Sequence, residues 1–179
     1  MVASTQIIPA SISMEEYLHT AYHPDCDFVD GVLEKRNGGE YEHSNLQAAL
    51  GAWFFNRGRE WGVRVLTEQR TRVGETRVRI ADVCIIQRGG AIERVRVTPP
   101  LLCIEILSRE DRITGTIRVL DDYLAMGVKN LWVFDPVDRV AMTYGAKGLK
   151  IAEGTRLEIA GTPIYLDCLS FLRCWIKPA

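Results

Sequence analysis

The sequence predicts a single α/β (α+β) domain over residues 1–179, with a mixed β-sheet flanked by helices and a flexible N-terminal segment at 1–12. Residues 101–107 (LLCIEIL) are apolar on both faces, which is typical of a central strand covered on both sides. A helical stripe at 113–124 and a second apolar run at 128–134 follow. This strand–helix–strand order implies two parallel strands joined by a crossover helix.

The chain is expected to begin with a short helix and a β-hairpin. Ser13 and Glu16 have the spacing of a capping box, in which a hydroxyl lies three residues before a carboxylate. The helix should end before Pro24. Residues 27–35 (DFVDGVLEK) predict two short strands around an Asp-Gly turn, and residues 37–39 predict a loop.

A longer helix and an antiparallel pair of strands are expected next. The helix begins at about Ser44, and one buried stripe has helical spacing, formed by Leu46, Ala49, Leu50, Trp53 and Phe54. Residues 63–73 and 77–87 predict the two strands. Alternation in the second strand places four side chains on one face, those of Val78, Ile80, Asp82 and Cys84.

The remainder of the chain is predicted to be mainly β. Gly127 has the place of a left-handed cap that ends the helix at 113–124. Residues 139–166 predict an antiparallel β meander, and a short helix is expected from Asp167.

Composition excludes several classes of protein. The hydrophobic content of 47% and the charged content of 25% are those of a folded globular chain. Five cysteines without a CxxC pair argue against a zinc cluster or a disulfide framework. The N-terminus lacks the pattern of a signal peptide, and no apolar run is long enough to span a bilayer. We therefore expect a cytoplasmic protein without a membrane partner.

Positive charge is concentrated in one stretch, although the net charge of the chain is only −1. Residues 57–96 contain ten arginines and five acidic residues, and no lysine. Such a stretch is typical of solvated strand edges. It is also compatible with a phosphate-facing surface, because arginine pairs bidentately with phosphate. The pattern alone favours the first interpretation.

Two acidic residues lie where apolar side chains are expected. Glu105 is in the middle of the run that should be buried on both faces, and Asp82 is on the inward face of its strand. An unpaired buried carboxylate costs several kcal/mol. A bound cation, a basic side chain or a proton must therefore neutralise each acid. The pattern favours a divalent-cation site and a structural polar pair about equally.

Several short blocks resemble one known family. These blocks are EHSNLQAALGAWF, VLTEQRTRV, VRIADVCII, LLCIEILSREDR and DDYLAMGVKNLWVFDP, preceded by SMEEYL and FVDGVLE. Their order and spacing resemble the Uma-type restriction endonuclease family, small bacterial proteins of the PD-(D/E)XK nuclease superfamily. The resemblance covers residues 14–136 and, more weakly, PIYLDCLSFL near the C-terminus.

The resemblance implies a restriction-endonuclease-like α-β-β-β-α-β core and a metal-dependent hydrolase. Asp82 would be the aspartate of the PD motif and Glu105 the acid of the (D/E)XK motif. Both would bind Mg²⁺ or Mn²⁺, together with the backbone carbonyl of Ile106. The reaction implied is hydrolysis of a DNA phosphodiester bond, and DNA would be the partner. Nucleases that cut both strands often act as twofold dimers, so a homodimer is expected.

The sequence departs from the family pattern at two positions. Ala81 replaces the motif proline, which takes no part in the chemistry. Leu107 stands where the motif lysine would point. Arg118, on the following helix beside Val119, is the candidate replacement. Arginine stays protonated and is a poor base, so Arg118 would stabilise charge, unless it is a solvated residue or an ion-pair partner of a neighbouring aspartate.

Three further residues match polar family positions. His43 precedes the predicted helix and is a candidate for contact with phosphate or metal, although local hydrogen bonding explains it as well. Gln69 is a candidate for contact with water or metal, and a solvent-facing strand residue is the alternative. Asp27 matches an acidic position or holds the hairpin in place.

Three functions from different classes remain open at this stage. The first is a Mg²⁺- or Mn²⁺-dependent endonuclease. The second is a catalytically degenerate nuclease fold that acts as a nucleic-acid-binding or protein-interaction module. The third is a structural oligomerisation domain. The missing motif lysine favours the second, whereas the intact acidic pair favours the first.

Overall fold

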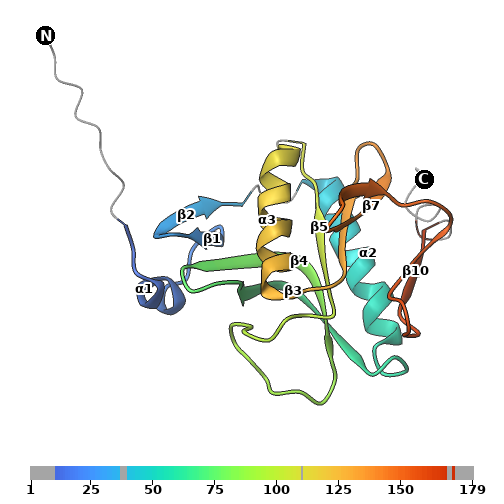
Figure 1. The fold of residues 1–179 in the computed structure, drawn as a ribbon, viewed down its shortest axis with the longest axis horizontal. Helices are drawn as coiled ribbons and strands as arrows, with labels where there is room; N and C mark the ends of the chain where they lie inside the picture. Colours follow the sequence, from blue (N-terminus) through green and yellow to red (C-terminus); the bar gives the residue numbers. More distant parts are fainter. Residues whose placement is uncertain (1–10, 37–39, 110, 169–170, 172–179) are drawn as a thin grey trace, which may run out of the picture.

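The computed structural model describes residues 11–36, 40–109, 111–168 and 171. An eight-stranded sheet has the order β2-β1-β4-β5-β6-β7-β8, and β3 also pairs with β4 (Figure 1). These strands are β1 (Cys26–Val29), β2 (Val32–Lys35), β3 (Val63–Arg72), β4 (Arg77–Gln87), β5 (Leu102–Ile106), β6 (Leu131–Asp135), β7 (Val140–Gly145) and β8 (Gly148–Ile151). The strands β9 (Arg156–Glu158) and β10 (Tyr165–Asp167) form a separate two-stranded sheet.

Two long helices cover opposite faces of the main sheet. In Figure 1, α3 (Ile113–Met126) crosses in front of the sheet and α2 (Tyr41–Arg57) lies behind it. The α2 side buries Leu46, Leu50 and Phe54 in one hydrophobic cluster with residues of β4, β5 and β6. The α3 side buries a second cluster that includes Leu120 and Tyr123. No helix in the described part of the chain is long and apolar enough to cross a bilayer.

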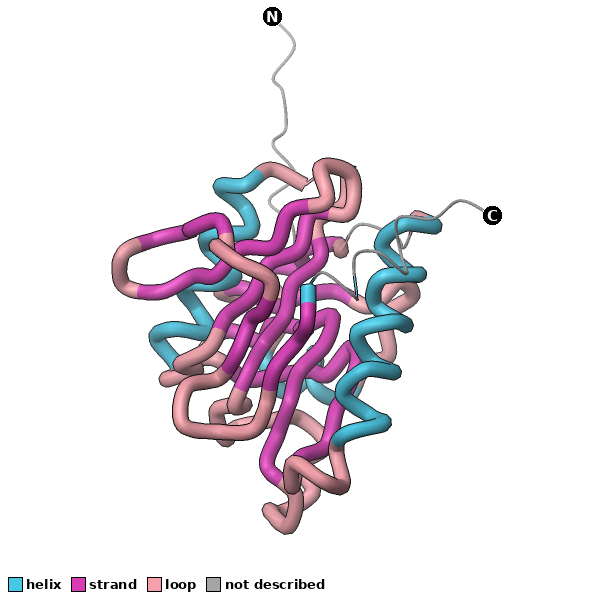
Figure 2. The backbone as a smooth tube through the Cα atoms, turned by 90° about the vertical axis from the view of Figure 1, so that its right-hand side faces the viewer, coloured by secondary structure: helices cyan, strands magenta, loops and turns pink. Residues whose placement is uncertain are grey.

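The predicted fold class is confirmed: helices flank a mixed sheet. β5 and β6 are parallel and are joined by α3, whereas the other strand pairs are antiparallel. Figure 2 shows the strands running side by side, with helices outside them. The predicted C-terminal meander is divided, because β7 and β8 extend the main sheet while β9 and β10 contribute to the cluster on the α2 side.

The N-terminal elements follow the sequence signals. Ser13 Oγ accepts a hydrogen bond of 3.0 Å from the Glu16 N–H at the start of α1 (Met14–His19). The N–H of Ile12 donates to the carbonyl of Gly31, whereas most of the N-terminal segment lies outside the described residues. The predicted loop at 37–39 and most of the helix expected from Asp167 also lie outside them.

Strict alternation does not hold along the whole of β4. The strand pairs with β1 through Arg77 and Val78 and with β5 through residues 83–85, so its two ends have different neighbours. Val78 packs in the cluster with α1, whereas Cys84 packs in the cluster with α3. The predicted single face of β4 is therefore divided between two parts of the core.

A buried ion network joins the hairpin, β4 and α3. Arg79 is only 3% exposed, yet it contacts the carboxylates of Asp27 at 3.0 Å, Glu34 at 2.7 Å and Asp122 at 2.8 Å. The other oxygen of Asp27 accepts the N–H of Ile80 at 3.1 Å. Each buried charge thus has a partner, as its burial requires. Asp27 holds the hairpin against β4, which was one of its two expected roles.

Asp27 should make stability depend on pH. Burial raises its pKa from 3.8 to about 6, although Arg79 opposes the shift. A raised pKa in the folded state favours folding below pH 3.8, and this contribution is lost as pH rises through about 6. Between about pH 4 and about pH 7, the free energy of unfolding should therefore fall by up to about 3 kcal/mol relative to an Asp27→Asn variant.

Urea unfolding of both proteins across this range measures the difference. Asp138→Asn, at an exposed aspartate, is the matched control and should show no such trend. A difference between the wild type and Asp27→Asn that stays constant with pH would contradict a raised pKa at Asp27.

Candidate active site

A polar pocket of about 200 Å³ lies between the β1–β2 hairpin, β4, β5 and the first turns of α3. Asp82, Glu105 and Ile106 all line it, as do His43 and Arg118. The antiparallel pairing of β4 with β5 brings the two acids together, because Val83 is directly opposite Ile104. Five of the six residues expected at the site therefore border the same pocket.

Asp82 is held rigidly at the edge of the pocket and is 1% exposed. Its Oδ2 accepts the backbone N–H of Ile106 at 2.7 Å and lies 3.4 Å from Nε2 of His43. Its Oδ1 forms an ion pair with Arg36. One carboxylate oxygen is thus committed to the backbone of β5, while the other faces a cation.

Glu105 carries the clearest sign of an incomplete site. Its Oε1 is fully enclosed and has no hydrogen-bond partner among the described residues. Burial and the nearby charge of Asp82 raise the pKa of Glu105 well above its ordinary value, whereas the charge of Arg36 and the Tyr123 hydroxyl oppose this shift. The Tyr123 hydroxyl likewise makes no hydrogen bond within normal distance among the described residues. The Glu105 side chain is therefore poorly accommodated as an isolated carboxylate and would gain from a positive charge.

Arg36 is the site residue that the sequence analysis missed. It follows β2, and its guanidinium joins the carboxylates of Glu68 and Asp82. The side chain is only 20% exposed. Burial lowers the pKa of Arg36, but the charges of Asp82 and Glu105 more than offset this effect, so Arg36 stays protonated. No local sequence signal identifies Arg36, because its partners are on strands distant in sequence.

Glu68 is a second acid that the sequence analysis did not identify. It lies opposite Asp82, because Thr67 pairs with Val83 and Gln69 pairs with Ala81. Glu68 has a positive φ of 52°, which is uncommon for a residue with a Cβ and costs about 1–3 kcal/mol. Such strain within a strand often marks a functional position.

The side-chain amide of Gln47 on α2 hydrogen-bonds to both Glu68 and Asp82. Its Nε2 donates to Glu68 Oε1 at 2.6 Å and to the backbone carbonyl of Asp82 at 2.9 Å. The side chain of Glu68, which is 46% exposed, contacts both Gln47 and Arg36.

His43 lies in the first turn of α2, which begins three residues earlier than predicted. A hydrogen bond to Asp82 raises the pKa of His43, and burial opposes this shift. Its Nδ1 is buried and has no hydrogen-bond partner among the described residues. His43 thus contacts one of the two candidate acids, and its other ring nitrogen remains unpaired.

Gln69 does not reach the pocket. It pairs with Ala81 instead of Asp82, and its amide donates to the backbone carbonyls of Arg70 and Arg94 at 3.0 and 2.9 Å. Neighbouring residues of a strand point to opposite faces, so the residue of β3 that faces Asp82 is Glu68. Glu68 does not border the pocket itself, but it contacts Arg36, which does.

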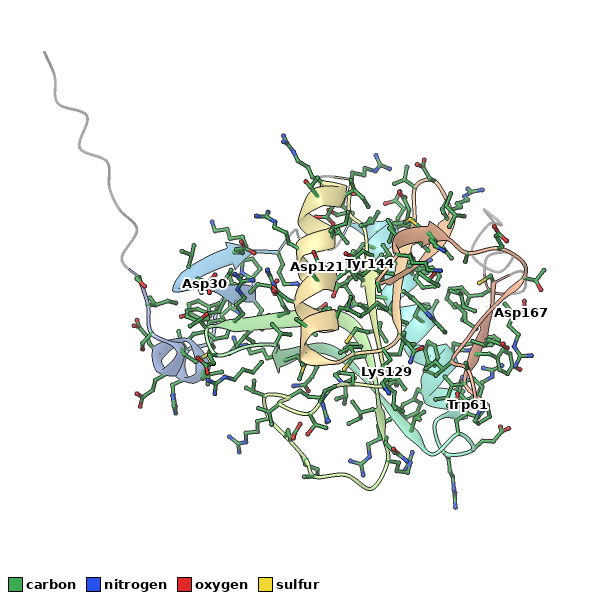
Figure 3. All side chains as sticks on the ribbon, in the orientation of Figure 1. Asp30, Trp61, Asp121, Lys129, Tyr144 and Asp167 are labelled. Atoms are coloured by element: carbon green, nitrogen blue, oxygen red, sulfur yellow. The ribbon has the colours of Figure 1, made fainter. Side chains whose placement is uncertain are left out.

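Arg118 is exposed on α3 at the edge of the pocket, and Leu107 also borders it. The aspartates next to Arg118 in sequence have other partners. Asp121 accepts a hydrogen bond from Tyr144, a pair labelled in Figure 3, while Asp122 contacts Arg77 and Arg79. Arg118 is thus placed as a cation at the pocket entrance.

The donor atoms of the pocket fit a hard divalent cation. Asp82, Glu105 and Ile106 border the pocket and offer carboxylate and backbone carbonyl oxygens, which Mg²⁺ and Mn²⁺ prefer. Within the described ranges, no group of three or more His, Cys, Asp or Glu side chains is placed to hold a metal. A cation here would therefore keep several water ligands, as Mg²⁺ usually does.

A solved structure shares this fold. A putative nuclease belonging to DUF820 from Anabaena variabilis ATCC 29413 matches with a TM-score of 0.78 at 16% identity, covering 90% of this chain and 98% of that one. The DrdV–DNA complex matches with a TM-score of 0.42 at 15% identity, covering 79% of this chain and 12% of that one. A TM-score this low does not establish a shared fold.

Sequence comparison identifies the family. No curated protein matches the chain. The family model Uma2, described as "Putative restriction endonuclease", matches residues 14–159, which include β1 to β9 and all three helices. The chain therefore belongs to the Uma2 family of restriction-endonuclease-like proteins.

Proposed function

We propose that this protein is an endonuclease that hydrolyses DNA phosphodiester bonds with the help of Mg²⁺ or Mn²⁺. The observation that supports it most is the enclosed, unpaired Oε1 of Glu105 beside the buried Asp82. Burial raises the pKa of Glu105, so without a cation this side chain must take up a proton on folding, which costs free energy at neutral pH. A divalent cation removes this cost.

The residues around the pocket have distinct roles in this proposal. Asp82 and Glu105 supply carboxylate oxygens, and Ile106 supplies a backbone carbonyl while its N–H orients Asp82. His43 holds the Asp82 carboxylate from the other side. When bound, the cation lowers the pKa of a coordinated water and offsets charge on the phosphate. Hydrolysis then joins the water oxygen to phosphorus, breaks one ester P–O bond and leaves a proton on the departing oxygen.

Cations at the entrance of the pocket suit a polyanionic substrate. Arg112 and Arg118 both border the pocket from the start of α3, and both are exposed. The first turn of α3 contains no acidic residue. Arginine binds phosphate oxygens bidentately and is not deprotonated, so these residues would hold the DNA backbone rather than remove a proton. Cutting both strands would need two pockets, and a homodimer would supply them.

One observation favours a second candidate, a degenerate nuclease that binds nucleic acid or a protein without cutting. Arg36 already neutralises Asp82, and Leu107 lies where the family resemblance places a lysine. Such a protein would use the cationic rim of the pocket without hydrolysis. The two candidates differ in whether the pocket binds a divalent ion and cleaves DNA.

The first test is cleavage of supercoiled plasmid and single-stranded DNA with Mg²⁺ or Mn²⁺. We expect cutting by the wild type and a loss of about 100-fold or more in Asp82→Asn and in Glu105→Gln, because each variant loses a charged oxygen donor for the ion. Lys150→Gln, at an exposed lysine on β8, is the control and should cut normally. DNA binding without cleavage, unaffected by EDTA, would support the degenerate nuclease instead.

A second test separates a cation site from a structural polar pair. Without divalent ions at neutral pH, Glu105→Gln should raise the free energy of unfolding by about 1–2 kcal/mol, because folding forces Glu105, with its raised pKa, to take up a proton, whereas the neutral amide needs none. Urea unfolding in EDTA measures this change. Adding Mn²⁺ should raise the melting temperature of the wild type but not of the variant. If Glu105→Gln instead destabilises the protein in EDTA, Glu105 is a structural hydrogen-bonding residue.

A further inference from the structure

Two arginines lie against the acids of the pocket, and their surroundings differ. Arg79 is 3% exposed and contacts three carboxylates, none of which belongs to the proposed cation site. Arg36 contacts Glu68 and Asp82, and the second of these is a proposed ligand of the ion. Binding of an ion would thus change the partners of Arg36 and leave those of Arg79 in place.

A divalent ion and Arg36 compete for the same atom. Asp82 Oδ2 already accepts the N–H of Ile106, so Oδ1 is the oxygen that faces the pocket cation, and Arg36 occupies it. Two positive groups on one carboxylate oxygen repel each other strongly in a partly buried site. The guanidinium must therefore leave Asp82 when an ion binds there.

Arg36 would stay in the pocket after leaving Asp82. Its other contact, with Glu68, does not involve the proposed ligands, and Gln47 holds the Glu68 side chain at 2.6 Å. The backbone of Glu68 has an uncommon positive φ of 52°. One edge of the Arg36 guanidinium is then available to a ligand, while the other edge still contacts Glu68.

We propose that Arg36 is the phosphate-binding residue of this pocket: it pairs with Asp82 until a divalent cation takes that carboxylate, and then binds the non-bridging oxygens of the DNA phosphodiester. The inference rests on the proposed function, since it presupposes the cation at Asp82 and Glu105. A guanidinium presents paired N–H donors that match two phosphate oxygens. Arg36 differs from Arg112 and Arg118 in being mostly buried beside the acids rather than exposed at the rim.

The proposal predicts opposite changes in two affinities. In Arg36→Gln, Mn²⁺ should bind at least about fivefold more tightly, because no internal cation competes for Asp82. A fluorescein-labelled DNA duplex in Ca²⁺ should bind roughly tenfold or more weakly, which corresponds to the loss of a charged hydrogen-bonded pair. Calorimetry measures the first affinity and fluorescence anisotropy the second, so neither depends on cleavage.

A matched control separates this effect from a general loss of positive charge. Lys129→Gln removes one charge near the carboxyl end of α3, far along the helix from the residues that border the pocket, as labelled in Figure 3. Both affinities should stay within about twofold of the wild type in this variant. Arg36→Lys, which keeps the charge but cannot contact two carboxylates through a planar fork, should change both affinities in the same directions as Arg36→Gln, and less.

Each outcome decides the matter. If both affinities fall in Arg36→Gln and in Arg36→Lys, Arg36 only organises the site. If neither affinity changes, Arg36 takes no part in binding. Either result overturns the inference. Such results beside a wild type that binds Mn²⁺ and cuts DNA leave the proposed function intact. A wild type that binds no Mn²⁺ overturns the proposed function and the inference together.

Discussion

The position of two acids on adjacent strands, one buried and one with an enclosed carboxyl oxygen, is the constraint on which this site depends. Asp82 on β4 and Glu105 on β5 are adjacent because the strands are antiparallel neighbours, and α3 closes the same side of the sheet. The nearby guanidinium of Arg36 contacts Asp82 but makes no hydrogen bond to Glu105 Oε1. The folded chain therefore contains a carboxyl group whose charged form is disfavoured by its surroundings and would be stabilised by a cation. This property favours binding of a small cation more than any motif does.

The carboxylate contacts of Arg79 stabilise the fold, whereas those of Arg36 belong to the proposed functional site. Arg79 connects the hairpin, β4 and α3 through Asp27, Glu34 and Asp122, so its removal would leave the buried Asp27 without a cationic partner. Arg36 contacts an acid that another cation can take, and it is held from its far side by Glu68. In our proposal, the contacts of Arg79 stabilise the fold permanently. The contact of Arg36 with Asp82 is instead exchanged for a contact with the bound ion.

The fold could be predicted from sequence because its signals are local. The apolar run at β5, the helical stripe of α3 and the alternation near the end of β4 each depend on nearby residues. Asp82 and Glu105 could be chosen as candidates because polar residues are conspicuous in apolar strands. Arg36 and Glu68 could not, since their contacts depend on how β2 and β3 meet β4. Gln69 does not border the pocket, because the β3–β4 register, which no local pattern specifies, decides which face of β3 each side chain lies on.

The central claim is that Asp82 and Glu105 form a divalent-cation site, and crystals grown with Mn²⁺ test it most directly. An anomalous difference map would place the metal without reference to activity. We predict a peak within coordination distance of Asp82 Oδ1 and Glu105 Oε1, with the Arg36 guanidinium displaced from Asp82. A map without a peak there at saturating Mn²⁺, with Arg36 still paired to Asp82, would contradict the claim and identify the two acids as a structural pair.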